Sequence, residues 1–422
     1  MTPATSPPVQ IAIACGGTGG HLFPGLAVAG ELVRRGCAAM LFISPKDVDR
    51  QAAEGVSGME IITLPAVGLT RGRGWEFLRS FIRSYRSTTK LFKSRRPQAA
   101  LAMGGFTSAP PILAARMVGA RAFIHESNAI PGRANRWLAR VVHGAFVGFP
   151  EAAGRLPNHN LTVTGTPVRS CFEVREPSAC RAKLGLDPAR PVLLVMGGSQ
   201  GARGINELMM QSLPILKARA PDWQWLHLTG SSDAQKVARA YADLQLRAIV
   251  RPFLAEMHVA LGAATAAVGR AGASSLAELA AMRVPAVLIP YPAATDNHQF
   301  HNARAFESSG AACLLEERTA SPDLLGQLLS DLIHKPAVRE KMRGALARWH
   351  APRAAEQIAS AILVAVGAEA GTHRYADQAI PARQDSGVAG PEANRRPSDP
   401  PEDRPIRMAD CRNMPLPAGR IA

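Results

Sequence analysis

The chain has 422 residues, of which 47% are hydrophobic and 19% charged, so it is long and apolar enough to bury the cores of two domains. It carries 49 Lys and Arg against 33 Asp and Glu, and its net charge of +16 favours anionic partners such as nucleic acid, an anionic membrane or a phosphorylated compound. No uncharged apolar run reaches the ~18 residues of a membrane span, no secretory signal pattern opens the chain, and the six cysteines form no C-x-x-C pair. These features predict a cytoplasmic protein with reduced thiols.

Short apolar runs alternate with helical stretches in the first part of the chain. One helical stretch is 25–36, in which apolar residues recur with helical spacing. Alternation of strand and helix predicts a parallel sheet with helices on both of its faces. The runs that we expect to form its buried strands are 9–15, 38–44, 59–64, 99–105 and 121–126.

The same pattern starts again at 191–201, where a strand-like run passes into a second glycine-rich loop. The runs that follow it are 223–229, 247–252, 264–268, 284–290 and 311–315. The sequence therefore predicts an α/β protein with two Rossmann-like, doubly wound parallel-sheet domains. Because such domains bind ligands at the carboxyl ends of their strands, we expect the site in a cleft between the two domains.

The boundary between the two domains is expected near the segment GTPVR (165–169). We assign 1–165 to the first domain and 166–366 to the second, whose last helix is a candidate to pack back on the first. The remaining residues, 367–422, are rich in proline and lack apolar periodicity, which predicts a disordered, low-complexity tail. That tail is either a plain extension or a docking segment.

The first glycine-rich loop, CGGTGGH (15–21), directly follows a predicted strand. It is not a P-loop, because no G-K-S/T follows, and it is not G-x-G-x-x-G, because Leu22 occupies the last position. The second predicted strand ends in Ser44 where a dinucleotide site has an acidic residue for the ribose. The pattern disfavours a nicotinamide-dependent enzyme. Two interpretations of the first loop stay open, a tight turn and an anion site.

Two later loops suit a diphosphate better. In GGSQGARGIN (197–206), glycines allow close backbone approach, Ser199 offers a hydroxyl, and a helix that begins near Ala202 points its free N–H groups at the ligand. The stretch GRAGASSLAEL (269–279) repeats this arrangement with Ser274 and Ser275. Its Glu278 is suited either to clasping ribose hydroxyls or to stabilising the start of the helix.

A dense polar cluster follows the predicted strand PAVLIP, within the segment 290–303. It consists of Asp296, Asn297, His298 and Gln299. Short polar side chains at the carboxyl end of a strand suit sugar hydroxyls, and the same composition is also found in surface loops.

Seven motifs occur in order along residues 9–365: GGTGGHLFPGLAVA, MGGFTSAP, HESNAIPGRANRWLA, GTPVR, GGSQGARGIN, RAGASSLAEL and DNHQFHNA. Together they resemble the MurG family, the glycosyltransferases of bacterial cell-wall synthesis. The resemblance implies a GT-B architecture and the inverting transfer of N-acetylglucosamine (GlcNAc) from UDP-GlcNAc to lipid I, which is undecaprenyl-diphospho-MurNAc-pentapeptide. The product would be lipid II, and no cofactor or metal is expected.

The resemblance also assigns roles to matching residues on the donor side. Arg169 would contact the nucleotide, Ser199 would reach the diphosphate, and Leu254 would lie by the uracil. The run 273–278 would wrap the phosphate, the sugar and, through its last residue, the ribose. Its members are Ala273, Ser274, Ser275, Leu276, Ala277 and Glu278.

Matching residues for the sugar and the acceptor come from both predicted domains. Asn128 would contact the donor sugar, and Gln299 would read sugar hydroxyls with His298 beside it. The residues of the first loop that would lie near the sugar and the acceptor are Thr18, Gly19 and Gly20.

Catalysis requires removal of a proton from the attacking hydroxyl of the acceptor. His21 is the candidate general base, because it closes the first loop and an unperturbed imidazole pKa of ~6.5 suits the task. The alternative is that His21 binds loop backbone or the acceptor phosphate, and His125 is a second candidate base. Family members carry a Tyr where this chain has Phe106, so a mechanism that uses that hydroxyl cannot operate here.

The segment 71–97 carries nine Lys or Arg and one acidic residue. Wound as a helix, it gathers aromatic and aliphatic side chains in roughly a 160° arc with basic residues beside them, which suits an anionic bilayer surface. The alternative is a helix that packs on the sheet, and we expect the later turns to pack while the Trp75 end stays exposed. The predicted membrane contacts are Trp75, Leu78, Arg79, Phe81 and Ile82.

The resemblance implies a peripheral protein on the cytoplasmic face of the inner membrane, with UDP-GlcNAc, lipid I, the anionic membrane surface and other cell-wall synthesis or division proteins as partners. A diacylglycerol glycosyltransferase of the same fold is the main alternative. Binding of nucleic acid is disfavoured, because no RNP-type aromatics and no KH-type G-x-x-G are present. Sugar-nucleotide binding without turnover is a third alternative.

Overall fold

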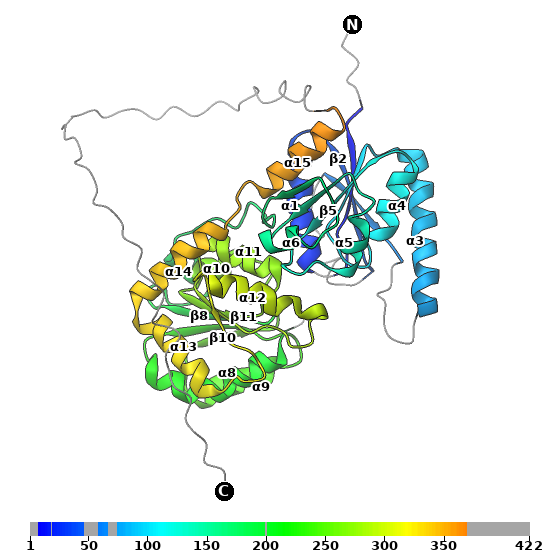
Figure 1. The fold of residues 1–422 in the computed structure, drawn as a ribbon. Coiled ribbons are helices and arrows are strands. Elements are labelled where there is room, and N and C mark those ends of the chain that lie inside the picture. Colours follow the sequence, from blue (N-terminus) through cyan, green and yellow to red (C-terminus); the bar gives the residue numbers. More distant parts are fainter. Residues whose placement is uncertain (1–6, 18, 46–57, 66–73, 199–200, 369–422) are drawn as a thin grey trace, which may run out of the picture. The chain divides into compact units, whose positions relative to one another are not determined.

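The computed structural model describes residues 7–17, 19–45, 58–65, 74–198 and 201–368. These residues belong to one compact unit that contains two parallel β-sheets (Figure 1). We refer to the part up to residue 163 as the N-terminal half and to the part from residue 177 to 349 as the C-terminal half. The predicted tail lies, except for residues 367 and 368, outside the described residues.

The N-terminal half is built on a seven-stranded parallel sheet with the strand order β3-β2-β1-β4-β5-β6-β7. Its strands are β1 (Gln10–Ala14), β2 (Ala38–Ile43), β3 (Met59–Thr63), β4 (Ala99–Ala102), β5 (Arg121–Glu126), β6 (Gly144–Val147) and β7 (Leu161–Val163). The helices between them are α1 (Gly19–Arg34), α3 (Gly74–Arg95), α4 (Ala109–Met117), α5 (Arg133–Leu138) and α6 (Pro150–Ala153).

The central strand β1 is apolar along its whole length because both faces of the sheet are covered. Ile11 and Ile13 belong to the core on the side of α1, whereas Ala12 and Ala14 belong to the core on the side of α3 and α4. Successive side chains of a strand point to opposite faces, so an uninterrupted apolar run is what a doubly covered parallel strand requires.

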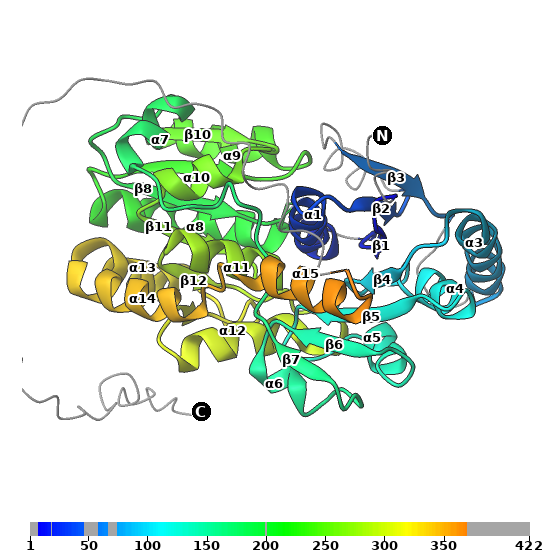
Figure 2. The same ribbon diagram turned by 90° about the horizontal axis from the view of Figure 1, so that it is seen from above.

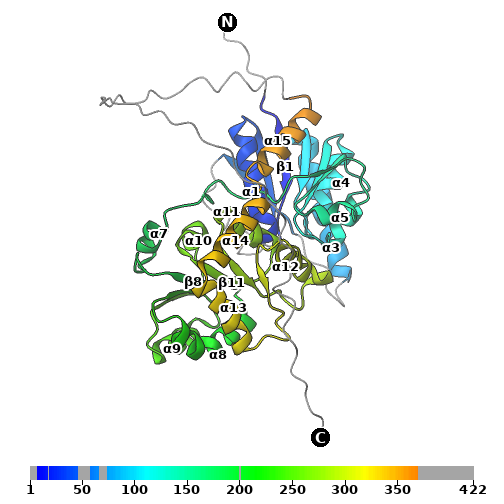
Figure 3. The same cartoon turned by 60° about the vertical axis from the view of Figure 1, so that its left-hand side comes forward.

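The C-terminal half repeats the design with a six-stranded parallel sheet in the order β10-β9-β8-β11-β12-β13. Its strands are β8 (Val192–Met196), β9 (Gln224–Leu228), β10 (Ala248–Arg251), β11 (Ala266–Gly269), β12 (Ala286–Leu288) and β13 (Cys313–Leu314). Its helices are α7 (Pro177–Leu184), α8 (Arg203–Arg219), α9 (Ala234–Asp243), α10 (Met257–Ala263), α11 (Ala273–Met282), the 3-10 turn η1 (Thr295–Asn297), α12 (His298–Ser308), α13 (Pro322–His334) and α14 (Pro336–Trp349). Figure 3 shows α8 and α9 next to each other, and these two helices are in contact.

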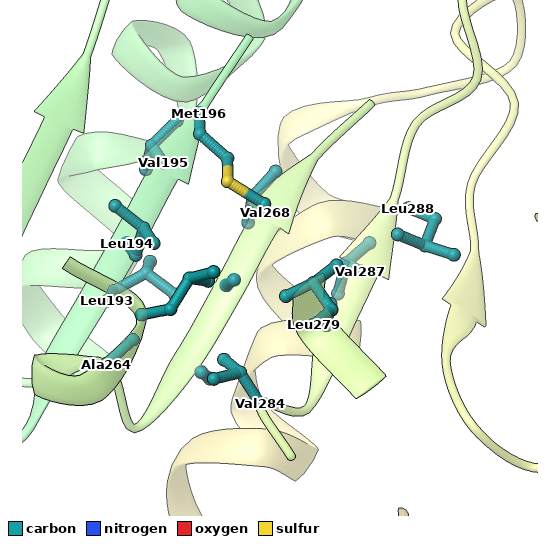
Figure 4. Packing of buried hydrophobic residues seen from close by; sticks show 14 of the residues in the cluster. Leu193, Leu194, Val195, Met196, Ala264, Val268, Leu279, Val284, Val287 and Leu288 are labelled. Carbon is teal, nitrogen blue, oxygen red and sulfur yellow. The ribbon is translucent and has the colours of Figure 1, made fainter. Parts of the chain in front are cut away.

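The core of this half lies between β8, β11 and β12 and the helices that cover them. Figure 4 shows Leu194 and Met196 of β8, Val268 of β11 and Leu279 of α11 among the buried side chains of this core. Leu194 and Val268 are completely buried. Each fully buried side chain of this size contributes roughly 1.5–3 kcal/mol, so burial of this kind supplies most of the stability of the half.

The last described helix, α15 (Ala354–Ala365), returns to the N-terminal half (Figures 1 and 2). Its Ile358 and Ile362 are fully buried in the cluster that contains Ile11 and Leu32 of α1. The aromatic side chains of Phe306 and Trp349 stack with ring centroids 4.4 Å apart just before the chain crosses over. The final helix of the second predicted domain therefore packs on the sheet of the first.

The two doubly wound parallel sheets confirm the predicted fold class. Each predicted strand run contains a strand, but the sequence reading did not include β6 and β7, which are only four and three residues long. The predicted start of the first helix was wrong. The helix begins at Gly19 rather than at residue 25, so His21 lies in its first turn and does not close a loop.

We expect two glycines of α1 to respond in opposite ways to substitution by alanine. A Cβ on Gly25 would lie 2.5 Å from Cβ of Cys15, whereas a Cβ on Gly30 would meet nothing within 4 Å. Gly25→Ala should lower the free energy of unfolding by about 1–3 kcal/mol, because the helix must move away from β1. Gly30→Ala should raise it by up to about 1 kcal/mol, because alanine favours the helix.

Urea unfolding of the two variants and the wild type measures both effects. Gly30→Ala serves as the matched control for Gly25→Ala, since both change one glycine of the same helix. Equal stability of the two variants would contradict the close approach of α1 to β1.

Candidate active site

Both sheets change their direction of winding next to a glycine-containing loop. In the N-terminal half the change falls between β1 and β4, and in the C-terminal half between β8 and β11. Ligands of doubly wound sheets bind outside the carboxyl ends of the strands at this position. Many of the residues that the sequence analysis singled out lie in the segments that follow β1, β8 and β11, including the first turns of α1 and α11.

The first turn of α1 faces the loop after β4. A Cβ on Gly105 would lie 3.1 Å from Cδ2 and 3.3 Å from Nε2 of His21, so the imidazole rests against the bare backbone of this loop. Phe106 lies against Gly17, where an added Cβ would be 3.1 Å from Cε1 of its ring. The structure thus brings His21 and Phe106 to the same edge of the sheet, at its switch point.

His125, the second candidate base, is completely buried on β5. Its Nε2 lies 3.1 Å from the carbonyl oxygen of Gly165 and its Nδ1 lies 3.2 Å from Oγ of Ser127. Burial lowers the pKa of His125 to about 4, with the hydrogen bond to Gly165 opposing and the charge of His21 adding to the effect. The ring is therefore neutral at pH 7 and both of its nitrogens are occupied, which leaves no nitrogen to act on a substrate.

Glu126 organises the segment that follows β5. Its carboxylate accepts four hydrogen bonds: from N and Nδ2 of Asn128 at 2.9 and 3.0 Å, from N of Gly132 at 2.9 Å, and from Nδ2 of Asn135 at 2.9 Å. Every partner is an N–H donor, so the carboxyl group acts only as an acceptor. The sequence analysis did not single out Glu126, because only the folded loop reveals its four donors.

The N-terminus of α11 meets the first turn of α1. Oγ of Ser274 donates a hydrogen bond to the carbonyl oxygen of Gly20 over 2.9 Å, although the two residues are 254 positions apart. The predicted site residues Gly19, Gly20 and Ser274 are therefore brought together. Thr18 lies outside the described residues.

The remaining predicted residues of α11 differ in what they offer a ligand. Ala273 is buried, and Leu276 is 1% exposed in the core, with its backbone N–H donating to the carbonyl oxygen of Gly272. Ser275, Ala277 and Glu278 are partly exposed. The side chain and the backbone N–H of Leu276 are therefore both engaged within the protein and do not reach a ligand.

The carboxyl group of Glu278 lies in a poorly solvated position beside Arg169. Desolvation raises the pKa of Glu278 to about 7, and the charge of Arg169 opposes this rise. The guanidinium of Arg169 is 4.4 Å from the ring centroid of Phe23 and 5.2 Å from that of Phe172. Its Nε is buried, and no group of the described residues accepts a hydrogen bond from it.

The second glycine loop connects β8 to α8 under tight constraint. A Cβ on Gly197 would lie 2.4 Å from the backbone nitrogen of Ala202. Behind the loop, Nδ2 of Asn206 donates to the carbonyl oxygen of Thr229 at 2.9 Å, and Oδ1 of Asn206 accepts from Nε2 of the buried His227 at 3.0 Å. These bonds hold the start of α8 against the end of β9. The predicted diphosphate contact Ser199 lies outside the described residues.

The polar cluster after β12 forms η1 and the start of α12. Nδ1 of His298 lies 2.8 Å from the carbonyl oxygen of Thr295, and Oε1 of Gln299 accepts from the backbone N–H of Tyr291 at 3.0 Å. Asp296 lies 2.7 Å from a guanidinium nitrogen of Arg136, which belongs to α5 of the N-terminal half. Leu254, the predicted uracil neighbour, is buried at the edge of the C-terminal core.

The long helix α3 has one packed side and one exposed side. Ser84, Thr88 and Phe92 are buried, and the helix packs on α4. Trp75 is 70% exposed, and Leu78 and Ile82 are also exposed. Arg79 is exposed as well, whereas Phe81 is partly buried and lies against Phe77 at a centroid distance of 6.2 Å. No helix in the described ranges is long and apolar enough to cross a membrane.

Two cavities among the described residues are not lined by the predicted donor residues. One of about 500 Å³ lies between the ends of β6 and β7 and the connection from α14 to α15, and none of the predicted site residues lines it. A second of about 300 Å³ lies beside η1 and is lined by Asn297 and Phe300 among others. Within the described residues, no group of three or more His, Cys, Asp and Glu is placed to hold a metal ion.

Comparison with known proteins decides the family. Residues 11–147 match the model of the glycosyltransferase family 28 N-terminal domain, and residues 192–358 match that of the family 28 C-terminal domain. The chain is 35% identical over 363 residues to a protein of Anaeromyxobacter dehalogenans named UDP-N-acetylglucosamine--N-acetylmuramyl-(pentapeptide) pyrophosphoryl-undecaprenol N-acetylglucosamine transferase, with 83% of this chain and 91% of the relative covered. The chain belongs to the MurG family of glycosyltransferases.

Further matches agree with the MurG family. A protein of Synechococcus sp. with the same name is 37% identical over 84% of this chain and 94% of its own length. The crystal structure of Acinetobacter baumannii MurG superposes with a TM-score of 0.67 and 27% identity, covering 85% of this chain and 100% of that one. The glycotransferase of kitacinnamycin, at 19% identity and a TM-score of 0.60, shares the fold.

The raised pKa of Glu278 predicts a pH-dependent gain in stability for Glu278→Gln. The native state keeps its proton up to about pH 7, whereas the unfolded state loses it near the model value of 4.5. Stability therefore falls as the pH rises from 4.5 to 7, by at most about 3 kcal/mol. The free energy of unfolding of Glu278→Gln should exceed that of the wild type most above about pH 7 and match it near pH 4.5.

Urea unfolding at several pH values across this range provides the measurement. Glu173→Gln is the control, since Glu173 is exposed and its replacement should change the free energy of unfolding by less than about 0.5 kcal/mol at every pH. A pH-independent difference for Glu278→Gln would mean that its carboxyl group is not desolvated in solution.

Proposed function

We propose that this protein transfers GlcNAc from UDP-GlcNAc to the MurNAc C4 hydroxyl of lipid I, with inversion at the anomeric carbon, and so forms lipid II. The N-terminal half would bind the acceptor and the C-terminal half the donor, with the domain boundary near residue 165. The names of the relatives that match most of the chain support this substrate pair.

The observation that carries the proposal is the meeting of α11 with α1. The hydrogen bond from Ser274 to Gly20 brings the N-terminus of a ten-residue helix beside the turn that bears His21. The departing UDP gathers negative charge as its bond to the sugar breaks, and free N–H groups at a helix N-terminus stabilise such charge by up to about 2 kcal/mol. The attacking group and the leaving group would therefore meet at this contact.

We infer the contacts with UDP-GlcNAc from the predicted site residues and from the polar groups that the fold leaves for a ligand. Nε of Arg169 is buried and has no acceptor in the described part of the chain, so this side chain fits the nucleotide phosphates. Glu278 fits the ribose hydroxyls, and Leu254 offers an apolar surface for the uracil. Asn128, His298 and Gln299 would contact the sugar, and Ser199, Ser275 and the N-terminus of α11 the diphosphate and sugar.

His21 is our candidate for the general base. Its imidazole lies against the Gly104–Gly105 backbone at the carboxyl edge of the sheet, whereas both nitrogens of the buried His125 are occupied. Phe106 carries no hydroxyl, so this chain would depend on His21, with Thr18, Gly19 and Gly20 beside it.

We further propose that α3 contacts the anionic surface of the cytoplasmic leaflet, where lipid I is embedded. The exposure of Trp75, Leu78 and Ile82 next to Arg79 supports this contact, since apolar and basic side chains together suit a lipid interface. Phe81 would contribute from its partly buried position. The protein would then be peripheral on the inner membrane.

The direct test supplies UDP-GlcNAc and a short-chain lipid I analogue. We expect release of UDP and formation of the disaccharide, measured by coupled assay and mass spectrometry. Transfer to diacylglycerol instead of lipid I would contradict lipid I as the acceptor and would support the alternative, a diacylglycerol glycosyltransferase. UDP-GlcNAc binding without any transfer would contradict the enzymatic proposal.

The same assay separates the two roles of His21. If His21 is the base, His21→Ala should lower kcat by about 10²- to 10⁴-fold while the KM for UDP-GlcNAc changes little. If it only binds the acceptor, kcat at saturating acceptor should stay near the wild-type value. The latter result would remove His21 as base.

Membrane contact predicts weaker vesicle binding when the exposed face of α3 becomes polar. The triple variant Trp75→Ser, Leu78→Ser, Ile82→Ser should bind phosphatidylglycerol-containing vesicles at least about tenfold more weakly, because the apolar area that enters the interface is lost. Cosedimentation measures the effect. Phe253→Ser, which changes a 56% exposed aromatic residue in the C-terminal half, is the control. Equal binding of the triple variant and the wild type would contradict the contact.

A further inference from the structure

Asn302, in the second turn of α12, joins the two halves of the molecule through one carboxamide. Its Oδ1 accepts from the backbone N–H of Ala129 at 2.9 Å, and its Nδ2 donates to Oδ1 of Asn128 at 3.0 Å and to the carbonyl oxygen of Ala271 at 3.2 Å. Asn128 and Ala129 follow β5 in the N-terminal half, whereas Ala271 precedes α11 in the C-terminal half. The side chain of Asn302 is completely buried.

The orientation of the neighbouring amide of Asn128 is fixed from the other side. Glu126 accepts from Nδ2 of Asn128, so the Oδ1 of Asn128 must point toward Asn302. Asn302 in turn must direct its NH2 group at two acceptors and its oxygen at one donor. If either amide were reversed, donors would face donors and acceptors would face acceptors. The hydrogen bonds that link Glu126, Asn128 and Asn302 therefore permit one orientation of each amide.

We propose that Asn302 is a positioning residue for the donor sugar. It fixes which atoms of Asn128 remain for the sugar: one N–H of Nδ2 and one lone pair of Oδ1. This inference rests on the proposed function, in which Asn128 contacts the sugar of the donor. Glu126 bonds to Asn128 from the same half, whereas Asn302 belongs to the donor half. Asn128 therefore has both of these partners only when the two halves meet.

The proposal predicts a loss that depends on the sugar and not on the nucleotide. Within the described residues, the hydrogen bonds of Asn302 go to Ala129, Asn128 and Ala271, and none goes to Arg169, Leu254 or Glu278, the residues proposed for UDP. Asn302→Asp keeps the oxygen that faces Ala129 but places a second oxygen against two acceptors. We expect kcat/KM for UDP-GlcNAc to fall about ten- to hundredfold, while the Kd of UDP alone changes by less than about twofold.

The chain offers a matched control in Asn158. Its Nδ2 also donates to two carbonyl oxygens, those of Ala139 and Val142, and its Oδ1 also accepts one backbone N–H, that of Asn160. All of these partners lie within the N-terminal half. Asn158→Asp should therefore leave kcat/KM for UDP-GlcNAc within about twofold of the wild-type value.

A double-mutant cycle tests whether Asn302 acts through Asn128. In an Asn128→Ala background, Asn302→Asp should lower kcat/KM by less than about threefold, because the amide that it positions is absent. Losses that simply multiply would overturn the proposal. So would an equal weakening of UDP binding in the single variant Asn302→Asp, since that would indicate general damage to the donor half.

Hydrogen exchange provides a test that needs no turnover. The Ala129 amide donates to Asn302, so Asn302→Ala should speed its exchange at least about tenfold in overlapping peptides of the full-length protein, whereas Asn158→Ala should not. Unchanged exchange at Ala129 would overturn the bridge even if the enzyme transfers GlcNAc. Faster exchange in a protein that transfers no GlcNAc would instead leave the bridge in place and reject the proposed function.

Discussion

The close approach of the backbone at the carboxyl ends of β1 and β8 is the constraint on which the rest of the site depends. A Cβ on Gly16 would lie 2.2 Å from the backbone nitrogen of Ser44, and a Cβ on Gly197 would lie 2.4 Å from that of Ala202. Only glycine fits where the chain passes this near to other backbone. As a result α1 and α8 begin within a few residues of their strands and direct their N-termini to the ligand edge of each sheet.

Among the described residues, ion pairs, hydrogen bonds and aromatic contacts join the halves, and they lie at different places. Near the switch points the contacts are polar: Ser274 bonds to Gly20, and Asn302 bonds to Asn128 and Ala129. Around α14 the contact is aromatic, where the ring of Phe149 lies 5.2 Å from that of Trp349. In the proposed function, a donor between α1 and α11 would replace the Ser274 hydrogen bond with bonds from its own phosphate or hydroxyl groups, at a small net cost in free energy. The aromatic contact can persist meanwhile.

Part of the positive charge of the chain lies on α3. The helix buries Ser84, Thr88 and Phe92 against the rest of the N-terminal half, which leaves its basic residues and its early apolar residues exposed. Small polar residues on the packed side suit the close contact of α3 with α4, and the hydroxyls of Ser84 and Thr88 are buried without a hydrogen-bond partner among the described residues. The apolar strip at the Trp75 end is therefore not needed for the fold, which is why its replacement tests a surface function.

The amino-acid pattern predicted the two sheets and the edge of each sheet at which the candidate site lies. Strands covered on both faces must be apolar throughout, so β1 and β8 are visible as continuous runs, and the glycines after them mark tight turns that local chemistry requires. The sequence did not reveal β6, β7 or the true start of α1. Strands of three or four residues have too little pattern, and the first turn of a helix needs no apolar side chain.

Only the tertiary structure decided which polar groups work together. The acceptor role of Glu126 depends on the path of the loop that folds around it, and the bridge from Asn302 to Ala129 spans 173 positions of the chain. Likewise, Nε2 of His125 meets the carbonyl oxygen of Gly165, which lies 40 positions along the chain, and the pKa of Glu278 is raised by burial that only the folded chain creates. A residue pattern records which groups are present, whereas hydrogen-bond direction and solvation depend on where distant segments meet.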